Sequence, residues 1–364
     1  MSITGIGETV LDIVFRGGQP QAAVPGGSTF NAMISLGRTV GRRFPEVALR
    51  MVTQTGDDPV ADIVSAFMKE NRVGTECVVR SPGQSTVSLA LLDEKSNAHY
   101  EFFRDRTLPA FTAPALDFGP GDIVLFGSFF AINPETREQA RALIRNARAS
   151  GTIVYYDINF RKNHDSKEAR PQIEENIALS DIVRGSSEDI AALYGTEDAA
   201  AVYAGHIAPL CANFICTKGA RETEVFSPGV QLSFPVPQDT AVVSTIGAGD
   251  NFNAGTVFAL IAMARDPLPS GQRKDLPHSG NAAQIAVPHG PVSACADRDG
   301  RAADAARKAF PERGEDFCFP SGAADGRTFA LADSDWRRIV PVAHKFSANV
   351  VASLYNYVDP DFEP

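Results

Sequence analysis

Short apolar runs alternate with amphipathic helical patterns along much of the chain, and this alternation restricts the fold more than any other feature. The run DIVLFGS at 122–128 is typical of a buried strand, whereas residues 134–150 carry charges on one side and apolar residues at helical spacing. The same alternation then continues with a strand at 152–159, a helix near 170–180, a strand at 181–185, a helix at 186–195 that begins at a serine cap and ends on glycine, and a strand at 213–219. This order predicts a mostly parallel sheet covered by helices on both faces.

Two stretches depart from this order. Residues 9–16 and 76–104 contain strand-like segments joined by tight turns without intervening helices, and they predict a small antiparallel sheet beside the main one. Residues 265–330 are rich in proline and glycine and are expected to form an insertion of unknown role before a last helix at 334–358. The 364 residues, of which 44% are hydrophobic, suffice for one large domain.

The composition restricts the binding partners and the cellular compartment that are expected for this chain. A formal net charge of −10 argues against nucleic acid or an anionic membrane as the main partner, although backbone amides can hold a phosphate in an acidic protein. The five cysteines are scattered without a C-x-x-C pair, so neither a disulfide framework nor a zinc site is expected. The first residues lack the pattern of a signal peptide and no apolar stretch is long enough to span a membrane. We therefore expect a soluble cytoplasmic protein.

The stretch STIGAGDNFNAG at 244–255 is the strongest candidate for chemistry. Gly247, Ala248 and Gly249 precede a long apolar helical run, so their N–H groups are expected at a helix N-terminus that favours an anion. Asp250 follows in the first turn, where a carboxylate can orient a substrate hydroxyl and accept its proton during phosphoryl transfer. A glycine turn with an acid that only complements the helix dipole has the same pattern, and this stretch alone leaves both interpretations open.

Several competing motifs are absent from the sequence. There is no G-x-x-x-x-G-K-[ST], and the stretches at 5–10 and 247–252 both lack the third glycine of G-x-G-x-x-G. Neither H-E-x-x-H nor G-x-S-x-G occurs. These absences argue against P-loop, Rossmann, metalloprotease and α/β-hydrolase chemistry.

Two motifs together resemble the signatures of the ribokinase-like, or PfkB, carbohydrate kinases. The stretch at 244–255 resembles the C-terminal signature, and PGGSTFNAMISLGR at 25–38 resembles the N-terminal glycine-rich motif, in the family's order. GETVLDIVF near the start and FSANVVASLYNYV near the end resemble the fructokinase-like branch and uncharacterised sugar kinases. The resemblance covers the chain except 265–330. It implies an α/β/α sandwich with a mainly parallel sheet, a β-sheet lid over the sugar, and ATP with Mg²⁺ as cofactors.

The resemblance also implies roles for individual residues. Asp250 takes the position of the catalytic base, and the amides of Gly247, Ala248 and Gly249 take that of the anion hole. YYDINFRKNH at 155–164 matches the family's D-x-N-x-R, so Asp157, Asn159 and Arg161 are expected to face the cleft. The residues expected to bind the substrate are Asp12, Gly26, Gly27, Asn31 and Arg161.

The nucleotide and metal positions match the family less closely. RGSSEDI at 184–190 occupies the place of the family's N-x-x-E motif, with Ser186 in place of asparagine and Glu188 or Asp189 as the acid of the Mg²⁺ shell. CTKGARE at 216–222 resembles the T-x-G nucleotide loop. The residues expected to contact the nucleotide are Ser186, Thr217, Gly219 and Asn349. Ser244 stands where many relatives carry an aspartate near a monovalent cation, so dependence on such a cation stays open.

The implied activity is ATP-dependent phosphorylation of a hydroxymethyl group on a sugar or related polyol. A nucleoside kinase of the same fold is an alternative, because Phe102, Phe129 and Phe130 are candidates to line a slot for a base. A non-catalytic sugar or nucleotide sensor is a second alternative, favoured only by the altered 184–190 motif. The lid sheet of relatives often pairs with that of a second copy, so the resemblance allows a homodimer through the lid and leaves the oligomeric state open.

Overall fold

The computed structural model describes residues 1–93, 98–160, 166–265, 329–353 and 355–364. Within these ranges one large sheet contains nine strands. In spatial order they are β13 (Val230–Pro235), β12 (Glu222–Ser227), β11 (Asn213–Thr217), β10 (Ile182–Ser186), β9 (Ile153–Asp157), β8 (Ile123–Gly127), β1 (Ser2–Ile6), β4 (Ala48–Gly56) and β5 (Val78–Ser81). Neighbouring strands from β11 to β5 run parallel, and β12 and β13 extend the sheet antiparallel.

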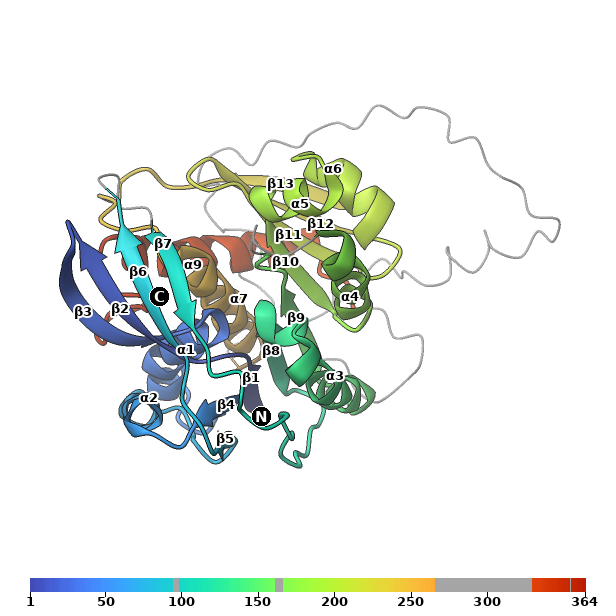
Figure 1. Ribbon diagram of the computed structural model, residues 1–364. Coiled ribbons are helices and arrows are strands. Elements are labelled where there is room, and N and C mark those ends of the chain that lie inside the picture. Colours follow the sequence, from blue (N-terminus) through green and yellow to red (C-terminus); the bar gives the residue numbers. More distant parts are fainter. Residues whose placement is uncertain (94–97, 161–165, 266–328, 354) are drawn as a thin grey trace.

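Helices cover both faces of this sheet (Figure 1). One face carries α1 (Ser28–Arg43), α2 (Pro59–Glu70), α7 (Ala248–Arg265) and α9 (Asp333–Val351). The other carries α3 (Pro134–Ala149), α4 (Ser166–Ala178), α5 (Ser187–Tyr194) and α6 (Ala199–Val202), with one-turn helices at Phe129–Ala131 and Tyr203–Ile207. The alternation in the sequence thus predicts the layered α/β/α architecture correctly.

A hydrophobic core lies between the sheet and each of its two helical layers. In β8, Ile123 and Leu125 join the core beneath α1, α7 and α9, while Val124 and Phe126 join the core beneath α3 and α4, because successive side chains of a strand point to opposite faces. Gly255 allows α7 to approach α9 closely, since a Cβ there would lie 2.6 Å from the Cα of Ala343. None of the helices in the described ranges combines the length and apolarity needed to cross a bilayer.

A second, four-stranded sheet stands beside the main one (Figure 1). Its order is β3 (Gln19–Gly26), β2 (Val10–Arg16), β6 (Val87–Leu92) and β7 (Ala98–Phe103), with β2 and β6 parallel and the other pairs antiparallel. The expectation that all of 76–104 belongs here is wrong, because β5 pairs with β4 in the main sheet. The sequence does not predict β3, because Pro20 and Pro25 interrupt the usual strand pattern at the sheet edge.

The last helix is shorter than the sequence predicts. It ends at Val351, and the expectation of a helix to residue 358 is wrong. Residues 355–364, called the tail below, are instead held against α1. The backbone N–H of Val358 donates to Ser35 Oγ at 3.1 Å, and Arg38 donates to the Val358 carbonyl at 2.6 Å. The predicted insertion lies outside the described residues except for its ends, Arg265 and residues 329–330.

His344 on α9 makes stability depend on pH. Its Nε2 lies 3.0 Å from the Thr223 hydroxyl in β12, and burial lowers the pKa of His344 to about 4. Since the unfolded chain takes up this proton near pH 6.5, the free energy of unfolding falls as the pH drops from 6.5 toward 4. We expect His344→Gln to show a smaller decrease in Tm over this range than the wild type. Equal decreases in the two proteins would contradict this assignment.

Candidate active site

A cavity of about 710 Å³ opens between the small sheet and the carboxyl ends of the parallel strands. Its walls come from β2 and β7, from residues that follow β8, β9 and β10, and from the starts of α1 and α7. Ligands of open α/β sheets bind at this carboxyl edge. Among the lining residues are Asp12, Gly27, Asn31, Arg184, Ser186, Glu188, Asp189, Gly247, Gly249 and Asp250.

Asp250 is fixed by two donors from the beginning of α1. Its Oδ1 accepts from Ser28 Oγ at 2.7 Å, and its Oδ2 accepts from Asn31 Nδ2 at 2.8 Å. The side chain is only half-buried and reaches the cavity. The two glycine-rich motifs, distant in sequence, therefore meet around one carboxylate whose orientation is set before any ligand binds.

The backbone beside Asp250 has the features of an anion site. α7 begins at Ala248, and a helix N-terminus offers N–H groups that the helix itself does not use. The N–H of Ala248 makes a long hydrogen bond of 3.3 Å to the Thr245 carbonyl, and Gly247 and Gly249 both line the cavity. Gly247 has a φ of +75°, and a Cβ there would lie 2.8 Å from the carbonyl oxygen of Asn356. The turn therefore requires glycine both for its backbone conformation and for its contact with the tail.

The small sheet contributes a buried carboxylate on its cavity side. Asp12 accepts a short hydrogen bond from Ser88 and another from Asn356 Nδ2 at 3.3 Å. Gly26 lies against it, and a Cβ at Gly26 would overlap the Asp12 carboxylate. Gly27, with a φ of +121°, similarly leaves no room for a Cβ beside the carbonyl of Glu8.

Asn31 joins the two sides of the cavity. Its amide nitrogen donates to Asp250, whereas its Oδ1 is buried and has no hydrogen-bond partner within the part of the chain that the structure describes. A buried acceptor without a partner costs free energy that a ligand hydroxyl would recover. Together with Asp12, this oxygen suits a ligand that carries several hydroxyl groups.

Ser186 and Asp189 form the start of α5. Ser186 caps the helix as predicted, and its backbone N–H donates to Asp189 Oδ2 at 2.7 Å. The other oxygen of Asp189 accepts from the Phe160 N–H at 2.8 Å. Burial raises the pKa of Asp189, and Arg184 opposes that shift. Both carboxylate oxygens of Asp189 thus accept hydrogen bonds from backbone N–H groups. Glu188, by contrast, is exposed and lines the cavity.

This donor set fits a magnesium ion that is held mostly by a nucleotide. In the described ranges no group of three or more His, Cys, Asp or Glu residues could hold a metal ion. Mg²⁺ in phosphoryl-transfer sites is usually bound by one or two carboxylates, substrate phosphates and waters. The exposed carboxylate of Glu188, which lines the cavity, is the candidate for a protein ligand of this kind.

Of the residues expected at the nucleotide, Ser186 lines the cavity, whereas Thr217, Gly219 and Asn349 lie beyond its lining. Thr217 ends β11, and its hydroxyl accepts from Arg184 Nη2 at 2.6 Å. Gly219 follows in the turn between β11 and β12, with a φ of +59°. Asn349 exchanges two hydrogen bonds with Asp359, of 3.1 and 2.9 Å, and so anchors the tail. The nucleotide roles of these residues stay predictions, and Arg161 lies outside the described residues.

The aromatic slot considered for a nucleoside is only partly present. Phe102 lines the cavity and stacks on Tyr100 with a centroid distance of 5.9 Å. Phe130 is instead buried in the core against Phe111, and Phe129 packs beneath the guanidinium of Arg104.

Sequence reasoning missed three residues of the site. Ser28 lies inside the N-terminal glycine motif, where a helix-start serine resembles an ordinary cap. Arg184 had a visible signal, because it is a charged residue within the apolar strand DIVRG. Asn356 has no such signal, because the sequence pattern around it predicts a helix.

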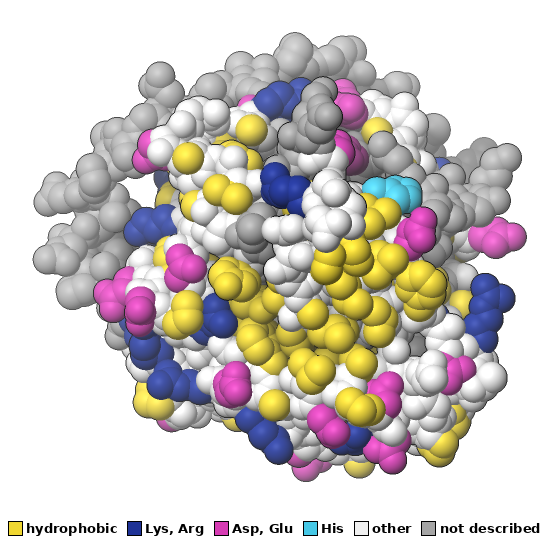
Figure 2. All heavy atoms as spheres, turned by 60° about the vertical axis from the view of Figure 1, so that its left-hand side comes forward, with side chains coloured by type: hydrophobic (Ala, Val, Ile, Leu, Met, Phe, Trp, Pro, Cys, Tyr) yellow, Lys and Arg dark blue, Asp and Glu magenta, His cyan; other side chains and the backbone are white. Residues whose placement is uncertain are grey.

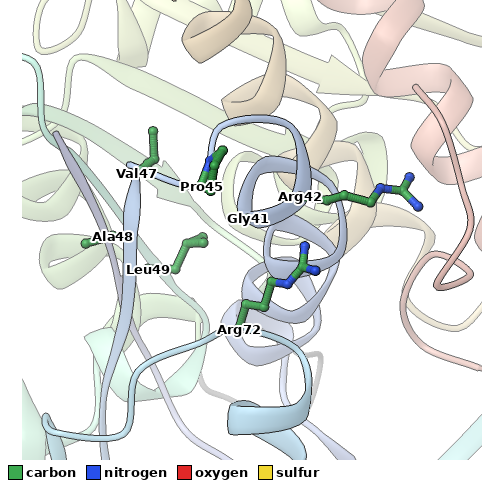
Figure 3. A pocket seen from close by; sticks show the side chains of 7 residues that line it. All are labelled: Gly41, Arg42, Pro45, Val47, Ala48, Leu49 and Arg72. Carbon is green, nitrogen blue, oxygen red and sulfur yellow. The ribbon is translucent and has the colours of Figure 1, made fainter.

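A second cavity, of about 530 Å³, lies at the far end of α1 (Figure 3). Its lining is Gly41, Arg42, Pro45, Val47, Ala48, Leu49 and Arg72. Gly41 follows Asn31 by ten helical residues, or about 15 Å of helix, and this lining contains no acid, histidine or nucleophile. The first cavity is therefore the candidate active site.

Comparison with known proteins decides the family. A profile of the pfkB family carbohydrate kinases matches residues 16–286. The chain belongs to the PfkB family of carbohydrate kinases. A relative of this PfkB kinase, fructokinase from Rhizobium leguminosarum bv. trifolii, is 29% identical over 266 residues, covering 70% of this chain and 78% of the relative.

Solved structures share the fold of this PfkB kinase. Fructokinase from Vibrio cholerae O395, bound to fructose, ADP and calcium ion, superposes with a TM-score of 0.62 at 22% identity, covering 71% of this chain and 83% of that one. Aminoimidazole riboside kinase from Salmonella enterica, complexed with aminoimidazole riboside and an ATP analogue, gives a TM-score of 0.61 at 20% identity over 71% and 84%. These likenesses confirm the ribokinase-like fold that the motifs predict.

Proposed function

We propose that this PfkB kinase transfers the γ-phosphoryl group of ATP to a hydroxymethyl group of a sugar or closely related polyol. The observation that carries the proposal is the Asp250 carboxylate, held by Ser28 and Asn31 beside the amides of the α7 N-terminus. A base fixed next to an anion site is the arrangement that phosphoryl transfer to a hydroxyl requires.

In the proposed reaction the substrate hydroxyl oxygen attacks the γ-phosphorus in line. The new oxygen–phosphorus bond forms as the bond to the β–γ bridging oxygen breaks, and that electron pair leaves with ADP. Asp250 accepts the hydroxyl proton, while the amides of Gly247, Ala248 and Gly249 stabilise charge on the phosphoryl oxygens. Glu188, next to Asp189, would hold Mg²⁺, which neutralises phosphate charge when bound.

The small sheet acts as a lid in this proposal. Its Asp12, backed by Ser88 and Asn356, accepts hydrogen bonds from sugar hydroxyls, and Asn31 Oδ1 accepts another. Tyr100 and Phe102 of β7 line the cavity from the side of this sheet. Excluding water from such a site prevents transfer of the phosphoryl group to water instead of the sugar.

The substrate class is tested by ADP release from Mg·ATP across ketoses, aldoses, sugar acids and ribosides. We expect a free sugar to give the strongest signal, with fructose the first to try because the Rhizobium and Vibrio relatives are named fructokinases. A riboside that outperforms every free sugar would support the second candidate, a nucleoside kinase, for which Phe102 stacked on Tyr100 provides an apolar wall. Silence across the panel with ATP bound would support a sensor.

We also propose that two copies of the chain pair through the outer face of the small sheet. Asp12 faces the cavity, so the alternate residues Ile13 and Phe15 point outward, where they pair in register with Leu89 and Leu91. Phe103, which is 55% exposed, continues this face. Figure 2 shows hydrophobic side chains gathered over a broad area on the side where the small sheet lies. Such patches mark interaction surfaces.

Light scattering coupled to gel filtration tests the pairing. We expect a dimer for the wild type and a monomer for Leu89→Glu, because a carboxylate on this apolar face would have to be desolvated in the interface. Ile63→Glu on α2, where Ile63 is 47% exposed, is the control and should stay dimeric. A wild type that is monomeric throughout, or a dimeric Leu89→Glu, would contradict the pairing.

A further inference from the structure

Arg184 is clamped between the strands on either side of its own. It lies in β10, is 7% exposed, and lines the cavity. Its Nη1 donates to Asp157 Oδ1 at 3.1 Å at the end of β9, and its Nη2 donates to Thr217 Oγ1 at 2.6 Å at the end of β11. The position of the guanidinium is therefore fixed by both neighbouring strands.

The clamped guanidinium lies against the start of α7. A Cβ placed on Gly249 would lie 2.9 Å from Arg184 Nη2 and 3.0 Å from Nη1. The buried Nε has no hydrogen-bond partner among the described residues. A guanidinium carries five N–H donors, and the bonds to Asp157 and Thr217 use two of them. Donors therefore remain directly beside the proposed anion hole.

Arg184 also brings positive charge to an acidic cavity. Of the described residues that line the cavity, Arg184 is the sole Lys or Arg, against five carboxylates: Glu8, Asp12, Glu188, Asp189 and Asp250. Asp157 does not line the cavity and accepts a second hydrogen bond from Asn253 at 2.9 Å. The negative partner of the ion pair thus lies behind the guanidinium, and the cation faces the ligand.

The guanidinium keeps its charge in this buried position. Burial lowers the pKa of Arg184, but the carboxylates of Asp157 and Asp189 outweigh burial and raise it. A polyphosphate that enters a cavity lined by carboxylates is repelled unless a cation offsets them.

We propose that Arg184 donates to the terminal phosphate of the nucleotide from beneath Gly249 and thereby makes the site prefer a nucleoside triphosphate to a diphosphate. This role rests on the proposed function, in which the terminal phosphate lies at the amides of 247–249. Because the clamp fixes the guanidinium in advance, its donors meet the phosphate without rearrangement.

Calorimetry with a non-hydrolysable ATP analogue and with ADP tests this role. The test variant is the double substitution Arg184→Gln with Asp157→Asn, which avoids leaving a buried carboxylate unpaired. Its affinity for the analogue should fall about tenfold or more, while its affinities for ADP and for the sugar stay within about threefold. Arg184→Lys keeps a positive charge but lacks the planar guanidinium with its several donors, and its affinity for the analogue should fall by less. Arg145→Gln, which removes an exposed arginine paired with Glu175, is the control.

The outcomes separate this role from the proposed function. A double variant that binds the analogue as tightly as the wild type, or loses ADP equally, would overturn the role of Arg184. A wild type that binds neither nucleotide would overturn the proposed function and this role with it.

Discussion

Asp250→Asn is expected to lower turnover by about a thousandfold while ATP still binds. A positioned general base contributes about 10²- to 10⁴-fold to proton transfer, and an amide of the same shape cannot accept the proton. The loss should appear in kcat rather than in the affinity for ATP, because the proposed role of Asp250 is to accept the hydroxyl proton, whereas the amides at 247–249 are proposed to hold the phosphates. Steady-state kinetics and calorimetry on the same preparation measure the two quantities.

Asp62→Asn is the matched control for this prediction. Asp62 also lies in the first turn of a helix, α2, but it is exposed and pairs with Arg80 at 2.7 Å. If Asp250 merely complemented the dipole of α7, the two variants would behave alike. Near-wild-type turnover in Asp250→Asn would remove Asp250 from the chemistry.

Gly247→Ala is expected to lower kcat by about a hundredfold or more, because removing one donor of an oxyanion-type site has an effect of that order. Gly247 has a φ of +75° and lies against the Asn356 carbonyl, so a methyl group there must displace the turn or the tail. Either shift moves the amides away from the phosphoryl oxygens.

Gly195→Ala separates this effect from backbone strain. Gly195 ends α5 with the same φ of +75°, and a Cβ there would meet nothing within 4 Å. This variant should lose about 1–2 kcal/mol of stability from the left-handed conformation alone and keep its turnover. Equal turnover in the two glycine variants would show that the amides at 247–249 do not act as proposed.

The sequence predicts the layers of this fold well because burial on two faces leaves a strong pattern. The strands β8 and β9 are buried along their whole length and mostly apolar, and α3 shows helical spacing with one charged side. The small sheet is harder to predict. β3 is largely exposed and contains two prolines, so neither hydrophobic alternation nor strand propensity identifies it, and only pairing with β2 makes it a strand.

The candidate site is predictable where two motifs each specify backbone conformation. Glycines at 26, 27, 247 and 249 and the acid at 250 stand out in the sequence because such combinations are locally unfavourable without a function. Asn356 could not be found in this way, because its position depends on the contacts of the tail with Ser35 and Arg38. Arg184 could be noticed but not assigned, since its role depends on strands that become neighbours only in the folded sheet.

Phosphorus NMR of the product tests the central claim most directly. The kinase is incubated with Mg·ATP and the sugar that gives the strongest ADP release, and the phosphorus signals are recorded with proton coupling. We predict a phosphate monoester whose phosphorus couples to two equivalent or near-equivalent protons of a CH₂–O group, formed in step with ADP. Inorganic phosphate alone, or an ester on a secondary hydroxyl, would contradict the proposed transfer to a hydroxymethyl group.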